Sequence, residues 1–289
     1  MNKVWEETSF IMKKYHIKAN KSLGQNFLIN ENVIKEIINS SQIEKQDCVI
    51  EIGPGLGTLT KELLEKAGKV ISIELDKKML PILKERFSLY KNFELINKDI
   101  LKVDLKKLIE EKKNEGLKNI KIVANLPYYI TTPIIMKLLE EKLDIQSITV
   151  MVQKEVADRL IAIPGKKETG AITYTVYYYA KGEEILEVSK DSFIPEPEVT
   201  SKVIKLNIRK KPEVNIKSPK IMFRIIKCAF MQRRKTLLNS LVNTKVFLNK
   251  EEGTKILKEL NLDINIRAEK LTLEDYAKIT NLVLNNMKN

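Results

Sequence analysis

The four residues Asn125-Leu126-Pro127-Tyr128 combine groups that could hold a flat heterocycle with an exocyclic amine. The side-chain oxygen of Asn125 and a nearby backbone carbonyl could accept the two N–H bonds of that amine. Pro127 lacks an N–H donor and stiffens the turn, while Tyr128 offers an aromatic face for stacking. The motif follows an apolar run at 122–124. From these residues alone, a buried strand followed by a proline turn with a buried tyrosine is an equally open interpretation.

A second candidate for ligand binding is the glycine-rich segment at 53–57, Gly-Pro-Gly-Leu-Gly, between a predicted strand and a predicted helix. Glycines such as Gly53 and Gly55 let the backbone approach a ligand closely. The spacing is G-x-G-x-G, and Thr58 stands where the dinucleotide fingerprint G-x-G-x-x-G has its third glycine. This departure argues against NAD, and the segment resembles the S-adenosylmethionine loop of class I methyltransferases.

Acidic residues follow the next two predicted strands. Glu74 ends the strand about 20 residues after the glycine loop, where a carboxylate can accept both ribose hydroxyl protons. Asp99 follows the third strand and could accept from the adenine amine of a cofactor, whereas Asp76 is expected to face the next helix. Each acid alone is more often a solvated loop residue. A glycine loop, a glutamate and an aspartate at three successive strand ends together predict a cofactor site.

The composition is that of a globular protein. With 289 residues, 43% hydrophobic and 31% charged, the chain can form one full core plus a smaller unit. No stretch approaches the ~20 apolar residues of a membrane span. The N-terminus has no basic-then-apolar signal sequence, so we expect a cytoplasmic protein without a membrane partner.

Cysteine and histidine are too scarce to favour metal or disulfide chemistry. Cys48 and Cys228 are far apart in the sequence and each lies beside apolar residues, which predicts buried thiols. His16 is the only histidine, and its neighbours do not suit a metal site. We therefore expect neither a metal cofactor nor a histidine general base.

The net charge of +13 is concentrated at the two ends of the chain. Residues 209–289 hold 18 Lys and Arg against 8 Asp and Glu, and the first thirty residues hold 5 Lys against 2 Glu. The middle of the chain is nearly balanced. Solvated lysine-rich faces would give the same totals, but the uneven distribution favours basic surfaces that bind a phosphate backbone.

Strands alternate with helices through the first half of the chain, which predicts βαβ units and an α/β fold with a mostly parallel sheet. The resemblance of the glycine loop implies that this fold is of the class I, Rossmann-like methyltransferase type. The expected strands are 47–52, 69–73, 93–96, 120–124 and 148–152, and the expected helices are 58–67, 76–88, 104–114 and 133–140.

After residue 165 the pattern changes. Segments 171–180 and 201–208, rich in Val, Ile, Thr and Tyr, read as two further strands that bring the sheet to seven with an antiparallel edge. Residues 193–197 between them are expected to form an extended loop. Residues 209–219 are charged, contain two prolines and read as a linker. Beyond it a small all-helical domain is predicted, with helices at 219–231, 234–242, 251–260 and 272–287.

The segment Lys21-Ser-Leu-Gly-Gln-Asn-Phe-Leu28, the glycine loop and the Asn-Leu-Pro-Tyr motif together closely resemble the rRNA adenine dimethyltransferase family, from about residue 18 to the end. That family has small-subunit enzymes of the KsgA type and large-subunit, Erm-type enzymes that confer macrolide resistance. Four features are similar to the small-subunit group: Leu126, where Erm-type enzymes usually have Ile, and the segments at 153–159, 193–199 and 230–241. The resemblance does not extend to residues 1–17.

The resemblance implies two domains, an S-adenosylmethionine-dependent methyltransferase domain at 1–208 and a basic helical RNA-binding domain at 209–289. It implies cofactor binding by Gln25, Asn26, Leu28, Gly53, Gly55, Glu74, Asp99 and Asn125. The catalytic residues would be Asn125, Leu126, Pro127, Tyr128 and Phe193, the last facing the target adenine opposite Tyr128. The RNA phosphates would be contacted by Arg233, Arg234 and Lys235.

The activity that the resemblance implies is methylation of N6 on two adjacent adenosines near the 3′ end of 16S rRNA, within immature 30S subunits. No interface pattern stands out, so a monomer is the default expectation. The nearest alternative is an Erm-type enzyme acting on 23S rRNA. A non-catalytic assembly factor with the same fold is a second alternative, although the intact Asn125 motif argues against it. A DNA adenine methyltransferase is a third, and those enzymes more often carry Asp at the first motif position.

Overall fold

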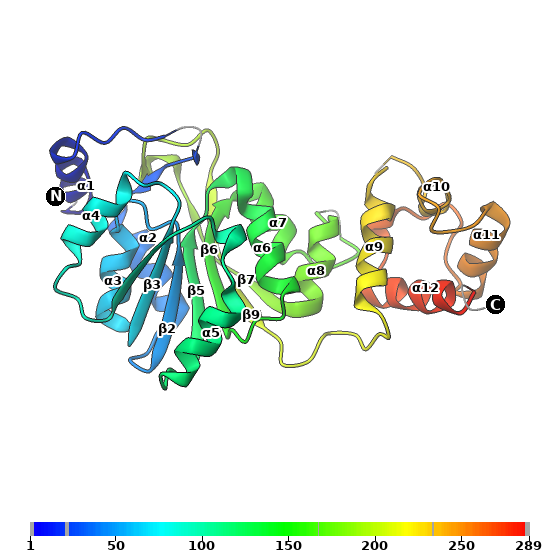
Figure 1. The fold of residues 1–289 in the computed structure, drawn as a ribbon. Coiled ribbons are helices and arrows are strands. Elements are labelled where there is room, and N and C mark those ends of the chain that lie inside the picture. The colour runs from blue at the N-terminus through cyan, green and yellow to red at the C-terminus, as the bar shows by residue number, and fades with distance from the viewer. Residues whose placement is uncertain (1–2, 21–22, 167, 233, 287–289) are drawn as a thin grey trace. The chain divides into compact units, whose positions relative to one another are not determined.

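A seven-stranded sheet in the order β4-β3-β2-β5-β6-β9-β7 organises the first part of the molecule (Figure 1). The computed structural model describes residues 3–20, 23–166, 168–232 and 234–286. The strands of the sheet are β2 (Asp47–Ile52), β3 (Lys69–Glu74), β4 (Phe93–Asn97), β5 (Asn119–Asn125), β6 (Ser147–Gln153), β7 (Ala180–Val188) and β9 (Ser201–Ile208).

The sheet is mostly parallel, and β9 runs in the opposite direction to its neighbour β6. Strand β2 pairs in parallel with both β3 and β5, so that Ile50 lies opposite Ile71 on one side and Ile122 on the other. β9 is antiparallel to β6, with Ile204 opposite Val150. The expected sheet of seven strands with an antiparallel pair is confirmed. Because the strand order changes direction at β2, a ligand crevice is expected beyond the carboxyl ends of β2 and β5.

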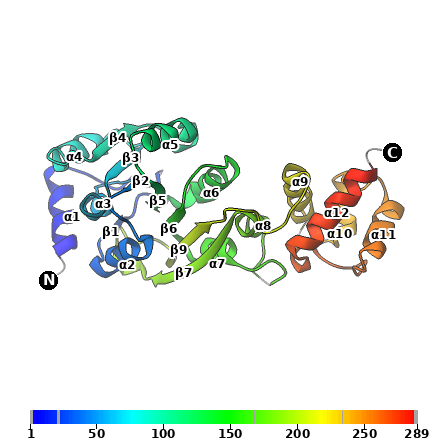
Figure 2. The same ribbon diagram turned by 90° about the horizontal axis from the view of Figure 1, so that it is seen from below.

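Helices cover both faces of this sheet (Figure 2). The first, second and seventh were not expected from the sequence, whereas the third to sixth lie where it predicts helices. Their bounds are α1 (Lys3–Lys14), α2 (Glu31–Ser41), α3 (Thr58–Lys66), α4 (Met79–Arg86), α5 (Leu105–Asn114), α6 (Thr131–Glu140) and α7 (Lys154–Ile161).

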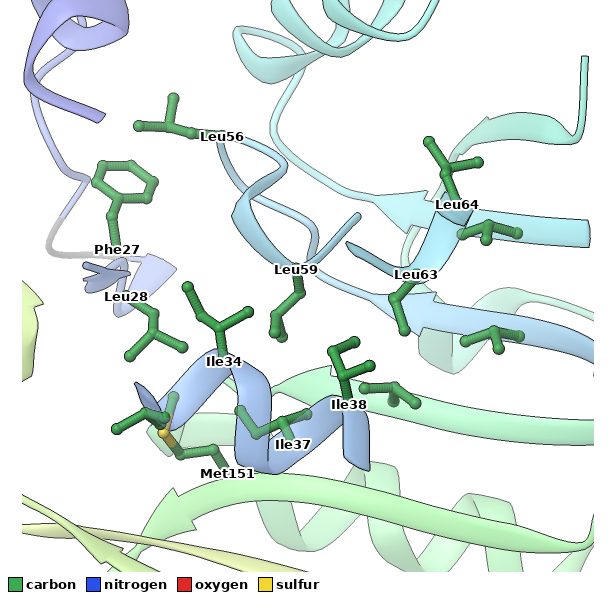
Figure 3. Packing of buried hydrophobic residues seen from close by; sticks show 14 of the residues in the cluster. Phe27, Leu28, Ile34, Ile37, Ile38, Leu56, Leu59, Leu63, Leu64 and Met151 are labelled. Atoms are coloured by element: carbon green, nitrogen blue, oxygen red, sulfur yellow. The ribbon is translucent and has the colours of Figure 1, made fainter. Parts of the chain in front are cut away.

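The core beside the glycine loop shows why α2 forms a helix. Its residues Ile34, Ile37 and Ile38 recur at helical spacing and are 1–6% exposed. Figure 3 shows their side chains on the side of α2 that faces Leu59 and Leu63 of α3. Each such burial contributes about 1.5–3 kcal/mol, so this face holds α2 against α3, the helix that follows the glycine loop.

The predicted strand at 171–180 is wrong, because residues 171–179 form helix α8 (Ala171–Tyr179) and the strand begins at Ala180. The backbone N–H of Gly170 donates to Thr173 Oγ1 at 2.9 Å at the start of the helix. Tyr174 and Tyr178, one helical turn apart, are 0% and 4% exposed. The ring of Tyr174 meets that of Tyr276 edge-on at 4.9 Å. Tertiary packing here overrides the strand preference of Tyr, Thr and Val.

The chain divides into two compact units, which are described separately. The first comprises Met1–Ala157 and Gly182–Ile208, and the second comprises Asp158–Lys181 and Arg209–Asn289. The second unit therefore includes α8 in addition to the C-terminal helices. Residues 209–218 contain neither helix nor strand, in keeping with the expected linker.

The second unit is helical, as the sequence predicts for its C-terminal part, and its core is built from α8 and the last four helices. Helix α9 starts at Pro219, a favoured first helical position. Tyr276, Leu241 and Phe247 are fully buried in this core. Among the described residues, no helix is long and apolar enough to cross a membrane. The C-terminal helices are α9 (Pro219–Phe230), α10 (Leu237–Asn243), α11 (Lys250–Glu259) and α12 (Leu273–Asn286).

Candidate active site

A pocket lies at the carboxyl ends of β2, β3 and β5, within the first unit. Its empty volume is about 1050 Å³, including its open mouth. Every cofactor-binding residue expected from the sequence lines it, and so do residues 125–128, whereas Phe193 does not. The lining comprises residues 23–28, 51–56, 58–59, 73–75, 98–100, 125–130 and 134.

Phe193 lies behind the pocket wall. It belongs to the short strand β8 (Phe193–Ile194), which pairs antiparallel with β1 (Phe27–Leu28), and it lies opposite Leu28. Its side chain is 2% exposed and packs in the hydrophobic cluster of the first unit. Phe193 therefore supports the segment that carries Leu28, and in this structure its ring does not face the pocket beside Tyr128.

The glycine loop needs glycine for two different reasons. Gly53 has a φ of 68° and nothing lies within 4 Å of the place where a side chain would start, so the space beside it is open for a ligand. Gly57 has a φ of 83°, and a Cβ there would lie 2.6 Å from the ring of Phe87. A backbone with φ above zero and a close approach both favour glycine over any other residue. The loop is thus open on its ligand side and tightly packed at its helix end.

Glu74 is held in place by backbone donors at the end of β3. Its two carboxylate oxygens accept from Gly55 N at 3.1 Å and from Asp76 N at 2.7 Å. Burial raises the pKa of Glu74, and these backbone bonds oppose that rise. Each carboxylate oxygen can accept a second hydrogen bond, so Glu74 keeps the capacity to bind a pair of hydroxyl groups.

The segment before β1 is tied to the same strand end. Gln25 donates from Nε2 to Asp76 Oδ2 at 2.9 Å and accepts from Asn20 N at 2.9 Å. Asp76 also accepts from Lys78 N at 3.0 Å, as expected for a residue that faces the next helix. Asp99 lies across the pocket, where one of its oxygens accepts from Leu101 N at 3.0 Å.

Asn125 ends β5 and lines the pocket. Its amide nitrogen Nδ2 donates to the backbone oxygen of Asn26 at 3.1 Å. This contact uses the donor end of the amide, so the acceptor Oδ1 is available for a ligand. The next residue, Leu126, is 1% exposed and donates from its backbone N–H to Met151 O at 3.1 Å. The start of the motif is therefore fixed on the sheet.

Tyr128 is half-buried and held by its hydroxyl. The hydroxyl is 2.6 Å from Ser201 Oγ, at the start of β9. Burial raises the pKa of Tyr128, so the phenol stays neutral at pH 7. The carbonyl of Pro127 accepts from Thr131 Oγ1 at 3.1 Å, which anchors the turn between them. A ring held at its polar end presents a fixed aromatic face.

The sequence analysis did not single out two residues that line the pocket. Glu51 is 1% exposed and accepts from Thr60 Oγ1 at 2.6 Å and Ser72 Oγ at 2.7 Å. Burial raises its pKa to about 7. The available signal was an acid inside the otherwise apolar run at 48–52. Tyr129 is 57% exposed, and its signal was a second tyrosine directly after the Asn-Leu-Pro-Tyr motif.

Two of the three expected RNA-binding residues fall within the described part of the chain, and both lie outside helices and strands. Arg234 and Lys235 are exposed in the segment between α9 and α10, while Arg233 lies outside the described residues. The N–H of Lys235 donates to Gln232 O at 2.8 Å, which closes a turn. No group of three or more His, Cys, Asp or Glu suited to a metal ion occurs among the residues that the structure describes.

Comparison with known proteins gives a consistent result. The family model described as "Ribosomal RNA adenine dimethylase" matches residues 16–285. A "Ribosomal RNA small subunit methyltransferase A" of Alkaliphilus oremlandii is 48% identical over 276 residues, which is 96% of each chain. The protein of the same name from Clostridioides difficile is also 48% identical, over 96% of this chain and 94% of its own length.

Solved structures extend the comparison to the fold. A dimethyladenosine transferase from Plasmodium falciparum superposes with a TM-score of 0.73 at 27% identity, covering 91% of this chain and 98% of its own. The 23S rRNA methyltransferase ErmE superposes with a TM-score of 0.67 at 22% identity, covering 89% and 99%. The likeness to ErmE shows a common fold.

Proposed function

Because the chain belongs to the ribosomal RNA adenine dimethylase family, we propose that its pocket transfers methyl groups to N6 of adenosines in small-subunit, 16S rRNA. The chain is an S-adenosylmethionine-dependent rRNA adenine dimethyltransferase with a class I methyltransferase fold. One observation carries the proposal for the site. One pocket is lined both by the glycine loop with Glu74 and by the segment from Asn125 to Tyr128.

The residues present fit the cofactor. Glu74 would accept hydrogen bonds from the ribose hydroxyls, and Asp99 would accept from the adenine amine. The open space at Gly53 would let the ligand approach the backbone of the loop closely. Gln25, Asn26, Leu28 and Gly55 would complete the cofactor-binding set. When bound, S-adenosylmethionine supplies a methyl group on a sulfonium for in-line transfer.

Asn125 would aim and activate the target amine. The lone pair of N6 in adenine is delocalised into the ring, so the amine is a poor nucleophile. Hydrogen bonds from its protons to Asn125 Oδ1 and to the Leu126 carbonyl would favour a more pyramidal nitrogen and fix its direction. Pro127 would hold this turn without a competing N–H. No general base is needed before attack.

Tyr128 would stack on the target adenine. The bond to Ser201 holds the ring before RNA binds, which lowers the entropy lost on binding. Stacking contributes ~1–3 kcal/mol per base, which offsets part of the few kcal/mol needed to unstack a nucleotide. The role expected for Phe193, on the second face of the base, stays a prediction that requires its buried ring to move.

The physiological substrate would be an immature 30S subunit, methylated on two adjacent adenosines near the 3′ end of its 16S rRNA. Repetition of the transfer on each monomethylated base would give N6,N6-dimethyladenosine. Arg233, Arg234 and Lys235 would contact RNA phosphates, as part of a basic helical domain at 209–289 beside a methyltransferase domain at 1–208. We propose a monomer that needs no metal ion.

The large-subunit alternative has less support. Relatives that match 96% of this chain at 48% identity are named for the small subunit, whereas the similarity to ErmE concerns the fold. The test is methyl transfer from labelled S-adenosylmethionine to undermethylated 30S subunits, with 50S subunits and an Asn125→Ala variant as controls. Dimethyladenosine in 16S rRNA alone, lost with Asn125→Ala, is the expected result. Label in 50S subunits would assign the large subunit, and cofactor binding without any transfer would indicate a non-catalytic assembly factor.

A further inference from the structure

Arg86 connects the glycine loop to the N-terminal helix. It is the last residue of α4, and 14% of its side chain is exposed. Its Nη1 donates to the backbone carbonyl of Leu56, in the middle of the loop. Its Nη2 donates to the carboxylate of Glu7 on α1 at 2.5 Å. One buried guanidinium therefore contacts both the cofactor loop and a helix that does not line the pocket.

The glycine loop needs a contact such as that of Arg86 because its own backbone could adopt several conformations. Its three glycines have φ values of 68°, 56° and 83°, and glycine adopts positive and negative φ about equally well. The ring of Phe87 fills the space under Gly57, and the guanidinium of Arg86 lies 5.3 Å from the centre of that ring. Phe87 thus packs against the loop at Gly57, and Arg86 binds the carbonyl of Leu56. Neither contact occupies the open side of the loop at Gly53.

Arginine suits this position better than lysine. A planar guanidinium presents several N–H donors in a fixed fork, so Arg86 can bind two acceptors that lie in different directions. Burial lowers the pKa of Arg86, and the negative charge of Glu7 opposes that effect. A buried cation without a partner is costly, so Glu7 is expected to determine how firmly Arg86 stays at the loop.

We propose that Arg86 is a positioning residue for S-adenosylmethionine binding and that α1 acts on the pocket through Glu7. The family model begins at residue 16, so α1 (Lys3–Lys14) lies outside the matched region. The proposal concerns the cofactor and not the RNA. It can therefore be tested by binding alone, whatever nucleotide the enzyme methylates.

The chain contains a matched control. Lys14 of α1 forms an ion pair with Glu85 of α4 at 2.7 Å, and both side chains are about half exposed, at 46% and 59%. This pair joins the same two helices as Glu7 and Arg86, but it involves neither the guanidinium nor the loop. Loss of the Lys14 pair reports how much α1 contributes through helix attachment alone.

The experiment is calorimetric titration of the full-length protein with S-adenosylmethionine, together with thermal unfolding without cofactor. Arg86→Gln is expected to raise the Kd about tenfold and Glu7→Gln about threefold, as loss of charged hydrogen bonds predicts. Lys14→Gln is expected to leave the Kd within about twofold, because surface ion pairs contribute little. The double variant Glu7→Gln/Arg86→Gln should bind no more weakly than Arg86→Gln, since the two residues act in series.

Kinetics on undermethylated 30S subunits add a readout that a general loss of stability would not give. KM for the cofactor should rise in Arg86→Gln, while kcat at saturating cofactor stays near that of the wild type. If Arg86→Gln does not fold, Arg86→Lys and Glu7→Gln decide the question. Equal Kd values for Glu7→Gln and Lys14→Gln would overturn the proposal, as would a lower melting temperature of Arg86→Gln with an unchanged Kd.

Discussion

Charged side chains lie where a ligand is expected both around the glycine loop and in the segment between α9 and α10, but the two sets differ in burial. Around the loop, Glu51, Glu74 and Arg86 are largely buried, and each has a hydrogen-bond partner within the protein. Between α9 and α10, Arg234 and Lys235 are exposed. The charged groups of the first region are therefore held in place before a ligand arrives, whereas Arg234 and Lys235 lie in contact with solvent.

This difference predicts different thermodynamics for the two ligands. Buried, paired groups are weakly screened by salt, so cofactor binding should depend little on ionic strength. Exposed cations bind RNA largely by releasing counterions, so that affinity should fall steeply as salt rises. Asn125 belongs to the first region by its position but would contact both ligands, and it therefore gives the sharpest test of whether the two can be separated.

The largest effect is expected for Asn125→Ala. Loss of the Oδ1 acceptor should lower kcat on the order of 10²–10³-fold, the range seen when one catalytic hydrogen-bonding group is removed. The Kd for the cofactor should rise by a smaller factor, about threefold. This rise is expected because Asn125 also binds the backbone of Asn26, a residue of the cofactor pocket. Single-turnover transfer and calorimetry on the same protein measure the two quantities. A loss confined to cofactor affinity would remove Asn125 from the chemical step.

Glu74→Ala should act on the cofactor alone. It removes the proposed ribose acceptor and leaves the N–H groups of Gly55 and Asp76 without their partner. We expect Kd for S-adenosylmethionine to rise about 100-fold, with kcat largely restored at saturating cofactor. Glu94→Gln is a suitable control, since Glu94 on β4 is paired with Lys69 of the neighbouring strand β3 and with Lys112 of helix α5. An equal effect of the control would mean that stability is being measured.

The buried acid Glu51 is expected to make the stability of the protein depend on pH. Its folded-state pKa of about 7 lies above the ordinary 4.5, so the folded protein retains a proton that the unfolded chain releases. The stability contributed by this proton is present below pH 4.5 and is lost as the pH rises through 7. Melting curves of Glu51→Gln should therefore be less dependent on pH between 5 and 8, with roughly 3 kcal/mol gained over the wild type at pH 8. Parallel curves for the two proteins would show that Glu51 is ionised throughout.

Glu51 also shows which features of the structure the sequence can predict and which it cannot. The alternation of strands and helices, the glycine loop and the acids after β3 and β4 are local patterns, and the structure places each of them as the sequence predicts. Glu51 is visible in the sequence as an acid in an apolar run, but its partners Thr60 and Ser72 become neighbours only after the chain folds.

Three features that the sequence analysis missed depend on contacts between distant parts of the chain. Residues 171–179 have the composition of a strand and become a helix because Tyr174 packs on Tyr276. The contact of Arg86 with Glu7 joins residues 79 positions apart. The burial of Phe193 depends on its pairing with Leu28. Local preference does not contain such information, since the energy that decides each case comes from the distant partner.

The smallest effects are expected in the exposed region, and they complete the comparison. Arg234→Ala and Lys235→Ala should each weaken binding to 30S subunits severalfold and reduce the slope of log K against log salt by about one. Neither should change the Kd for S-adenosylmethionine. Lys106→Ala, at an exposed lysine on α5, controls for the loss of one positive charge elsewhere on the surface. Because the control changes net charge by the same amount, only a difference in slope between it and the two variants supports direct phosphate contact. Equal slopes would mean that the exposed cations act through overall charge, and the RNA would then have to be bound by other residues.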